Sequence, residues 1–242
     1  MIWKTSVGGC IYQIDNIKVH QNLAFRWLTL GSDAIQTLVY RYNPEQFGLT
    51  YIPVLTVAVK AIPASACLLG LGGAGVAHAL RSYLKNIKLD AVEKNANIIA
   101  IANRYFMTCE LNYLNIIHED ANHFVRNTAN RYKHLMVDLF NADSFPAECR
   151  HADFFYHCHR ALLPEGVLAV NLANLTEQWP LFLAIREHFQ QFTLSIPIKD
   201  SANIIILAYK NNTIQSFLNL IRHHLRLKRI VWDSMWGWVA YL

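Results

Sequence analysis

ACLLGLGGAGVAHALRSYLKNIKLDAVE, residues 66–93, is the stretch of sequence that decides the fold. An apolar strand, Cys67–Leu71, runs into a glycine-rich turn, the helix Val76–Leu84 follows, and a second strand ends on Glu93. This order is typical of the first unit of a nucleotide-binding α/β domain. Glycines let the backbone approach a ligand, the helix N-terminus offers free N–H groups, and an acid 21 residues after Gly72 can accept hydrogen bonds from a ribose. A tight turn without a ligand is the alternative interpretation of the glycines alone.

Residues 51–212 alternate between helical and extended patterns, which predicts a mostly parallel sheet of seven strands with helices on both faces. A helix over Leu49–Ala61 leads into this region. The last two strands are joined by a short polar link, so we expect them to pair antiparallel at the edge of the sheet. The expected strands are Cys67–Leu71, Lys88–Val92, Leu114–His118, His134–Asp138, Gly166–Leu172, Phe192–Pro197 and Asn203–Lys210.

The two ends of the chain have a different character. Residues 1–50 hold short extended segments separated by turn residues, which predicts a small antiparallel β-meander. Residues 213–242 predict a helix and then an aromatic tail, VWDSMWGWVAYL, whose tryptophans need burial against the domain or a partner subunit. We therefore expect three segments, 1–50, 51–212 and 213–242.

Composition limits the kind of protein. The chain is 53% hydrophobic and 16% charged, which supports a large core, excludes disorder and favours a buried interface, so we expect a homodimer. The net charge of +5 is scattered, and we interpret the basic run Arg222–Arg229 as a solvated helix face. We expect no nucleic-acid partner and, without a secretory or membrane-spanning pattern, no membrane association. Five irregularly spaced cysteines indicate reduced thiols and a cytoplasmic location.

Acidic residues follow three consecutive strands of the expected sheet. Because ligands of open α/β sheets bind beyond the carboxyl ends of the strands, Glu93, Asp120 and Asp138 should share one rim with the glycine turn. The set suits an adenosine, with Glu93 on the ribose, Asp120 and the Ala121 N–H on the adenine, and Asp138 near the reactive end. Asp120 alone also fits a helix N-cap.

The same residues exclude some nucleotides. No Lys-Ser or Lys-Thr pair follows the glycines, so the turn is not an ATP-binding P-loop. A pyrophosphate would face acidic side chains unfavourably, whereas the positive sulfur of a sulfonium nucleoside would be attracted to them.

Histidines and cysteines gather between residues 149 and 159. His157, Cys158 and His159 are adjacent on an expected helix and point in different directions, which does not suit a zinc site. We expect no metal.

Several segments resemble the spermidine/spermine synthase (polyamine aminopropyltransferase) family, a branch of the S-adenosylmethionine-dependent methyltransferase fold. The similarity covers roughly residues 10–210. It rests on LTLGSDAIQT (28–37), LLGLGGAGV (68–76), AVEKNANIIAIANRYF (91–106), HEDANHFVRN (118–127), YKHLMVDLFNADSFP (132–146) and FFYHCHRALLPEGVLAVNL (154–172). The resemblance implies a Rossmann-like class I methyltransferase fold with a small N-terminal antiparallel β-region.

The resemblance also implies roles for individual residues. The cofactor-binding positions would be Gln36, Gly70, Gly72, Gly73, Glu93, Asp120 and Ala121. Asp138 would be the catalytic proton acceptor or amine anchor, with Tyr51 and Asn141 at the substrate.

The chain departs from the family pattern at the acceptor end. Gly73 stands where the family has an aspartate, and Ile52 and Pro53 replace a histidine and a glutamate. Asn141 replaces the second acid of the catalytic loop, while Asp143 is near but out of register. Each lost acid removes a charged hydrogen bond worth about 1–3 kcal/mol.

These observations predict a spermidine synthase-like transferase that uses S-adenosylmethionine or decarboxylated S-adenosylmethionine, with an altered site for a small-molecule acceptor such as an amine. The glycine at position 73 would tolerate a methionine carboxylate, so methyl transfer stays open beside aminopropyl transfer. The alternative is a catalytically silent nucleoside-binding or protein-interaction protein of the same fold.

Overall fold

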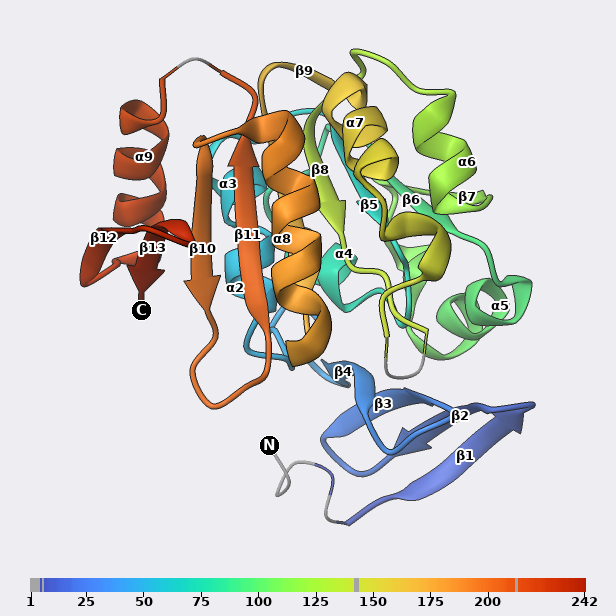
Figure 1. The fold of residues 1–242 in the computed structure, drawn as a ribbon. Helices are drawn as coiled ribbons and strands as arrows, with labels where there is room; N and C mark the ends of the chain where they lie inside the picture. Colours follow the sequence, from blue (N-terminus) through green and yellow to red (C-terminus); the bar gives the residue numbers. More distant parts are fainter. Residues whose placement is uncertain (1–4, 6, 142–143, 212) are drawn as a thin grey trace.

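The computed structural model describes residues 5, 7–141, 144–211 and 213–242. In this part of the chain, a four-stranded antiparallel sheet has the order β1-β2-β3-β4, and a nine-stranded sheet has the order β12-β13-β10-β11-β9-β8-β5-β6-β7 (Figure 1). The seven expected central strands are all present, and most neighbours among them are parallel. The predicted α/β fold with an antiparallel N-terminal region is confirmed.

The strands of the small sheet are β1 (Gly9–Ile14), β2 (Ile17–Gln21), β3 (Phe25–Leu30) and β4 (Ile35–Tyr40). Those of the large sheet are β5 (Ala66–Leu69), β6 (Leu89–Glu93), β7 (Leu114–His118), β8 (Tyr132–Val137), β9 (Leu162–Leu172), β10 (Thr193–Pro197), β11 (Ile204–Tyr209), β12 (Arg229–Asp233) and β13 (Gly237–Tyr241). The α-helices are α2 (Ile52–Leu55), α3 (Val57–Ala61), α4 (Gly75–Ala79), α5 (Ala96–Tyr105), α6 (Ala121–Arg126), α7 (Ala152–Ala161), α8 (Leu175–Phe189) and α9 (Gln215–Leu225).

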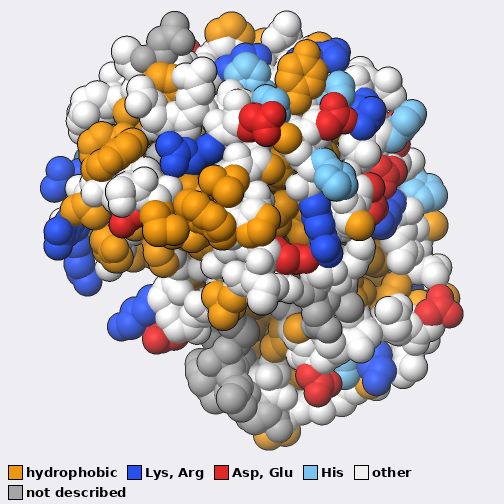
Figure 2. Space-filling view, viewed as in Figure 1, with side chains coloured by type: hydrophobic (Ala, Val, Ile, Leu, Met, Phe, Trp, Pro, Cys, Tyr) orange, Lys and Arg blue, Asp and Glu red, His pale blue; other side chains and the backbone are white. Residues whose placement is uncertain are grey.

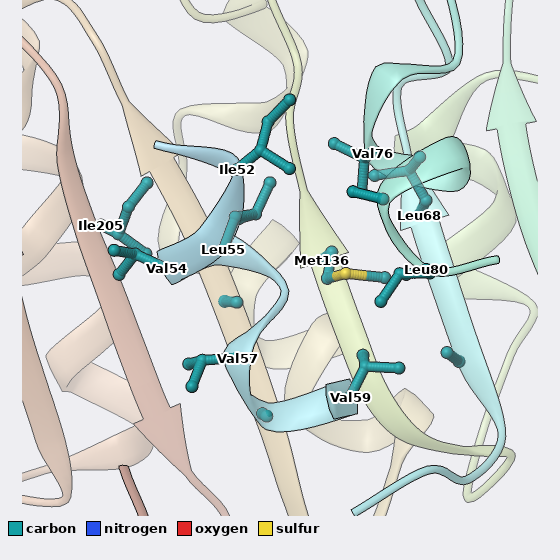
Figure 3. Close-up of a cluster of buried hydrophobic side chains, with 14 of the residues drawn as sticks. Ile52, Val54, Leu55, Val57, Val59, Leu68, Val76, Leu80, Met136 and Ile205 are labelled. Carbon is teal, nitrogen blue, oxygen red and sulfur yellow. The ribbon is translucent and has the colours of Figure 1, made fainter. Parts of the chain in front are cut away.

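Helices cover both faces of the large sheet. One hydrophobic cluster joins α2, α3, α4 and α9 to one face, and a second joins α6, α7 and α8 to the other (Figure 1). Figure 3 shows part of the first cluster, with Leu80 lying beside Met136 of β8, and Val54 beside Ile205 of β11. The central strands are buried on both faces, as expected for a parallel sheet, because a layer of helices covers each face.

The prediction of a single helix over Leu49–Ala61 is wrong in detail, because two short helices, α2 and α3, occupy this region. Pro53 occupies the first turn of α2, where its missing N–H costs nothing. The hydroxyl of Thr56 donates to the carbonyl oxygen of Ile52 over 2.7 Å, a local bond that competes with regular helical geometry. The helix is therefore interrupted at Thr56.

The aromatic tail extends the sheet, which the sequence reasoning missed. β12 and β13 form a hairpin, and β13 pairs in parallel with β10, so the antiparallel β10–β11 pair lies inside the sheet and not at its edge. Asp233 Oδ1 stabilises the turn by accepting hydrogen bonds from the N–H groups of Met235 and Trp236 at 2.9 and 2.8 Å. Gly237 has a φ of +69°, a conformation that favours glycine.

The small sheet packs against α5. Ile17, Val19 and Leu28 share a hydrophobic cluster with Ile101 and Phe106, which fixes the small sheet near the carboxyl ends of the central strands. Across the described residues, no helix is both long enough and apolar enough to cross a membrane.

Candidate functional site

A cavity of about 950 Å³ lies between the small sheet and the carboxyl ends of β5, β6, β8 and β9. Its volume is at the upper end of the usual range for small-molecule sites. The lining includes nine of the ten predicted site residues, namely Gln36, Tyr51, Gly70, Gly72, Glu93, Asp120, Ala121, Asp138 and Asn141. The glycine turn, Glu93, Asp120 and Asp138 therefore lie at one rim, beyond the carboxyl ends of the strands.

Gly70 joins β5 to the cavity floor and cannot carry a side chain. Its φ is +93°, and a Cβ atom would lie 2.3 Å from the carbonyl oxygen of Asp138. The N–H of Asp138 donates to the carbonyl oxygen of Leu69 over 2.9 Å, so the ends of β5 and β8 are held together. Glycine is thus required for the close approach of these two strands.

Gly73 is the predicted residue that falls outside the described lining. Its N–H donates to Thr37 Oγ1 over 2.9 Å, and a Cβ atom here would lie 2.9 Å from Thr37 Cγ2 and 3.0 Å from two ring atoms of Phe106. A side chain at position 73 would therefore run into the small sheet and α5. Glycine at this position allows the small sheet to dock, and it gives no information about which donor the cavity would accept.

Glu93 bridges the glycine turn and the start of α5. Its Oε2 accepts from the N–H of Leu71 over 3.2 Å, and Oε1 accepts from the N–H of Asn95 over 3.0 Å. The side chain is half-buried and lines the cavity, so these bonds fix the carboxylate at its edge. Each carboxylate oxygen can accept a further hydrogen bond, which a ribose diol could donate.

Asp120 is both a helix N-cap and a lining residue of the cavity, the two positions that the sequence analysis considered. It is the N-cap of α6, where Oδ1 accepts from the N–H groups of Asn122 and His123 at 2.9 and 3.1 Å. It also lines the cavity beside the buried Ala121. Capping therefore orients the carboxylate without removing it from the cavity.

Asp138 is held by two neutral donors. Tyr51 Oη donates to Oδ2 and Asn171 Nδ2 donates to Oδ1, both at 2.8 Å. Burial raises the pKa of the Asp138 carboxyl, and the hydrogen bonds from Asn171 and Tyr51 oppose that rise. Burial and the adjacent carboxylate raise the pKa of the Tyr51 phenol well above its usual value, so Tyr51 acts as a donor here. A carboxylate with a raised pKa is a better proton acceptor near neutral pH.

Asn171 and Asn203 continue this network and were missed in the sequence reasoning. Asn203 Nδ2 donates to Asn171 Oδ1 over 2.7 Å, and the Ser201 hydroxyl donates to Asn203 Oδ1. Asn171 is buried near the carboxyl end of the apolar strand β9. The sequence signal that could have identified Asn171 is a single amide in an otherwise apolar strand, because a buried polar side chain needs a hydrogen-bond partner.

Asn141 lies in the loop after β8. It is exposed and lines the cavity, and it exchanges backbone hydrogen bonds of 2.9 Å with Ser144 in both directions. Asp143, the nearby acid that is out of register with the family pattern, lies outside the described residues.

The described lining is strongly acidic. Its carboxylates are Asp33, Glu93, Asp120, Asp138 and Glu148. Lys94 is its one basic side chain among the described residues, and its ammonium group lies 2.8 Å from Glu148 Oε1. The hydrogen bond to Glu148 raises the pKa of Lys94, so the lysine stays charged and paired. The cavity therefore favours a cationic ligand.

The histidines and cysteines of residues 149–159 form no metal site in the structure. No group of three or more His, Cys, Asp or Glu side chains in the described part of the chain is arranged to hold a metal ion. Cys149, just before α7, and Cys158, on α7, are buried in the core, where burial raises the pKa of both thiols.

Two curated relatives are polyamine aminopropyltransferases. The one from Neisseria meningitidis serogroup A is 24% identical over 192 residues, which cover 77% of this chain and 73% of the relative. The one from Chromobacterium violaceum is 23% identical over 214 residues, covering 87% and 82%. No protein-family profile matches the chain.

Solved structures share the fold. A probable spermidine synthase from Corynebacterium glutamicum has a TM-score of 0.73 at 16% identity and covers 90% of this chain and 87% of its own. A spermidine synthase in complex with the transition-state analogue AdoDATO has a TM-score of 0.68 at 17% identity, covering 87% and 75%. Human methyltransferase-like protein 13 in complex with SAH has a TM-score of 0.58 at 18% identity, covering 77% and 94%. The chain is therefore similar in sequence to polyamine aminopropyltransferases, and its fold is like that of spermidine synthases and of a methyltransferase.

Proposed function

We propose that the chain is a transferase that uses S-adenosylmethionine or its decarboxylated form, with an acceptor site that differs from that of the aminopropyltransferases. The observation that carries this proposal is the meeting of Gly70, Glu93, Asp120 and Asp138 around one acidic cavity. In this arrangement Glu93 binds the ribose and Asp120 the adenine, next to Ala121. Gln36 reaches the same cavity from β4.

The charge of the cavity favours the decarboxylated donor. S-adenosylmethionine carries a carboxylate, which would need a cationic partner, and the lining lysine is already paired with Glu148. The decarboxylated compound carries a sulfonium and an amine, both of which suit the carboxylates. Binding of each donor can be compared by calorimetry, and we expect the decarboxylated form to bind more tightly.

The transfer step assigns a role to Asp138. The lone pair of the acceptor nitrogen attacks the carbon bonded to the sulfonium, the C–N bond forms, and the C–S bond breaks with its electron pair moving to sulfur. The nitrogen must carry this lone pair when it attacks, so an ammonium acceptor first gives a proton to the Asp138 carboxylate, which passes it to water. The products are the alkylated amine and the neutral thioether of adenosine.

The decisive experiment measures binding and turnover separately. The thioether product 5′-methylthioadenosine should raise the Tm of the protein, because a ligand that binds only the folded state stabilises it. Turnover with an amine acceptor would then be followed by mass spectrometry. Binding without any turnover across a panel of acceptors would favour the silent nucleoside-binding protein, and the absence of binding would overturn both possibilities.

We also propose that two copies associate through β12. This strand forms one edge of the large sheet, and the adjoining side chains Leu183, Trp232 and Met235 are 47%, 52% and 55% exposed. Figure 2 shows hydrophobic side chains gathered near the C-terminal hairpin and α8. Antiparallel pairing of two β12 strands centred on Val231 would place Arg229 of each copy opposite Asp233 of the other, which is the favourable charge arrangement.

Sedimentation velocity can test this dimer with a charge swap. The Arg229→Asp variant would oppose two aspartates and should dissociate, whereas Arg229→Asp combined with Asp233→Arg restores opposite charges and should recover the dimer. A monomeric wild-type protein, or a dimer unaffected by the single substitution, would contradict this arrangement.

A further inference from the structure

The acceptor end of the cavity is lined by amides. It is formed by the residues after β8, at the end of β9 and before β11. Among the described lining residues of these three segments that surround Asp138, the other polar side chains are those of Ser201 and four asparagines, Asn141, Asn171, Asn174 and Asn203. Glu148, which follows later in the β8 loop, is paired with Lys94 beyond β6 and belongs to the other end of the cavity, the nucleoside end, which Glu93, Asp120 and Ala121 line.

Among the described residues of this end, Asp138 carries the single negative charge. The amide chain from Asn203 through Asn171 ends on Asp138 Oδ1, and Tyr51 donates to Oδ2. The two donors that the structure describes for this carboxylate are neutral, so they orient Asp138 without neutralising it. Both oxygens keep lone-pair capacity for one further donor group.

This arrangement limits the charge that an acceptor can carry. One ammonium group can pair with Asp138, but a second would lie among amides and the apolar side chains of Phe140 and Leu175. Asn141, Leu175 and Ser201 are exposed there, and the amides offer a second ammonium no opposite charge, whereas a hydroxyl or amide can exchange hydrogen bonds with asparagine side chains. Asp33 also lines the cavity, but it lies exposed on the β3–β4 hairpin and not at these strand ends.

We infer that the acceptor carries one amine and, at its other end, a neutral hydroxyl or amide group. This inference rests on the proposed transferase function and narrows its substrate class. The amine supplies the attacking lone pair and loses its proton to Asp138, while the neutral end is held by the asparagines. The C–N bond forms as the C–S bond of the sulfonium donor breaks, as in the step above.

A matched pair of probes tests the inference. 4-Aminobutan-1-ol and 1,4-diaminobutane have the same length and differ in one terminal group. With the protein saturated by 5′-methylthioadenosine, calorimetry should give at least about tenfold tighter binding of the amino alcohol. Equal or tighter binding of the diamine would overturn the inference, even if both compounds are alkylated.

A second experiment tests the same inference by adding a charge to the cavity. Asn141→Asp adds a carboxylate at an exposed lining position, and it should move the preference about tenfold toward the diamine. Asn219→Asp adds the same charge on α9, away from the cavity, and should leave the preference unchanged. An unchanged preference in Asn141→Asp would also overturn the inference. Failure of 5′-methylthioadenosine to bind would instead overturn the proposed function, and this inference with it.

Discussion

The nucleoside end and the acceptor end of the cavity differ in what fixes their polar groups. Glu93 is held by the backbone N–H groups of Asn95 and of Leu71, which lies in the turn after β5, and Asp120 is held by backbone N–H groups at the start of α6. Asp138 is held by side chains from Tyr51 and Asn171, which lie far from it in the sequence. Backbone groups at neighbouring strand ends therefore build the nucleoside end, whereas the acceptor end depends on side chains from distant segments. This difference indicates that the acceptor end can change while the nucleoside end is retained.

The largest effect should come from Asp138→Asn. Loss of the proton acceptor should reduce kcat by about 10²- to 10⁴-fold, while the dissociation constant of 5′-methylthioadenosine should change little. Single-turnover kinetics and calorimetry measure the two quantities. A comparable loss of nucleoside binding would show that the two ends do not act separately. Tyr51→Phe, which removes one donor and keeps the carboxylate, should cost less than Asp138→Asn.

Glu93→Gln tests the nucleoside end. Replacing the charged acceptor should weaken 5′-methylthioadenosine binding by about 10- to 100-fold, because hydrogen bonds to charged groups are worth about 1.5–3 kcal/mol. The kcat at saturating donor should stay near the wild-type value. Glu119→Gln, one residue before Asp120 and paired with His123, is the matched control and should bind normally. A loss of kcat without a loss of affinity would reverse the roles assigned to the two ends.

Asn171→Ala should have the smallest effect and a characteristic pH dependence. The Asn171 hydrogen bond lowers the pKa of Asp138, so its loss should raise that pKa further. The carboxylate must be ionised to accept a proton, so kcat/KM falls as the pH drops through this pKa, and that acid limb should move to higher pH. At neutral pH we expect a loss of about threefold to tenfold, corresponding to roughly 1 kcal/mol. A uniform loss without a shifted profile would indicate a purely structural role for Asn171.

The sequence predicted more of the nucleoside end than of the acceptor end. Gly70, Glu93 and Asp120 follow apolar strands directly, and their position at the rim follows from the parallel arrangement of those strands. Asn171 and Asn203 carry no comparable pattern, because their partners are set by the pairing of β9 with β11. Gly73 shows the limit of a motif comparison, since the small sheet and not the cavity faces this position.

The sequence by itself determined the alternation of strands and helices, the glycine turn and the acids at the strand ends, because these depend on local periodicity and backbone freedom. Only the tertiary structure decided that the aromatic tail becomes β12 and β13 and joins β10 in parallel. It also decided that Tyr51, Asn171 and Asn203 converge on Asp138. Such contacts depend on which distant surfaces bury one another, and no short stretch of sequence specifies that choice.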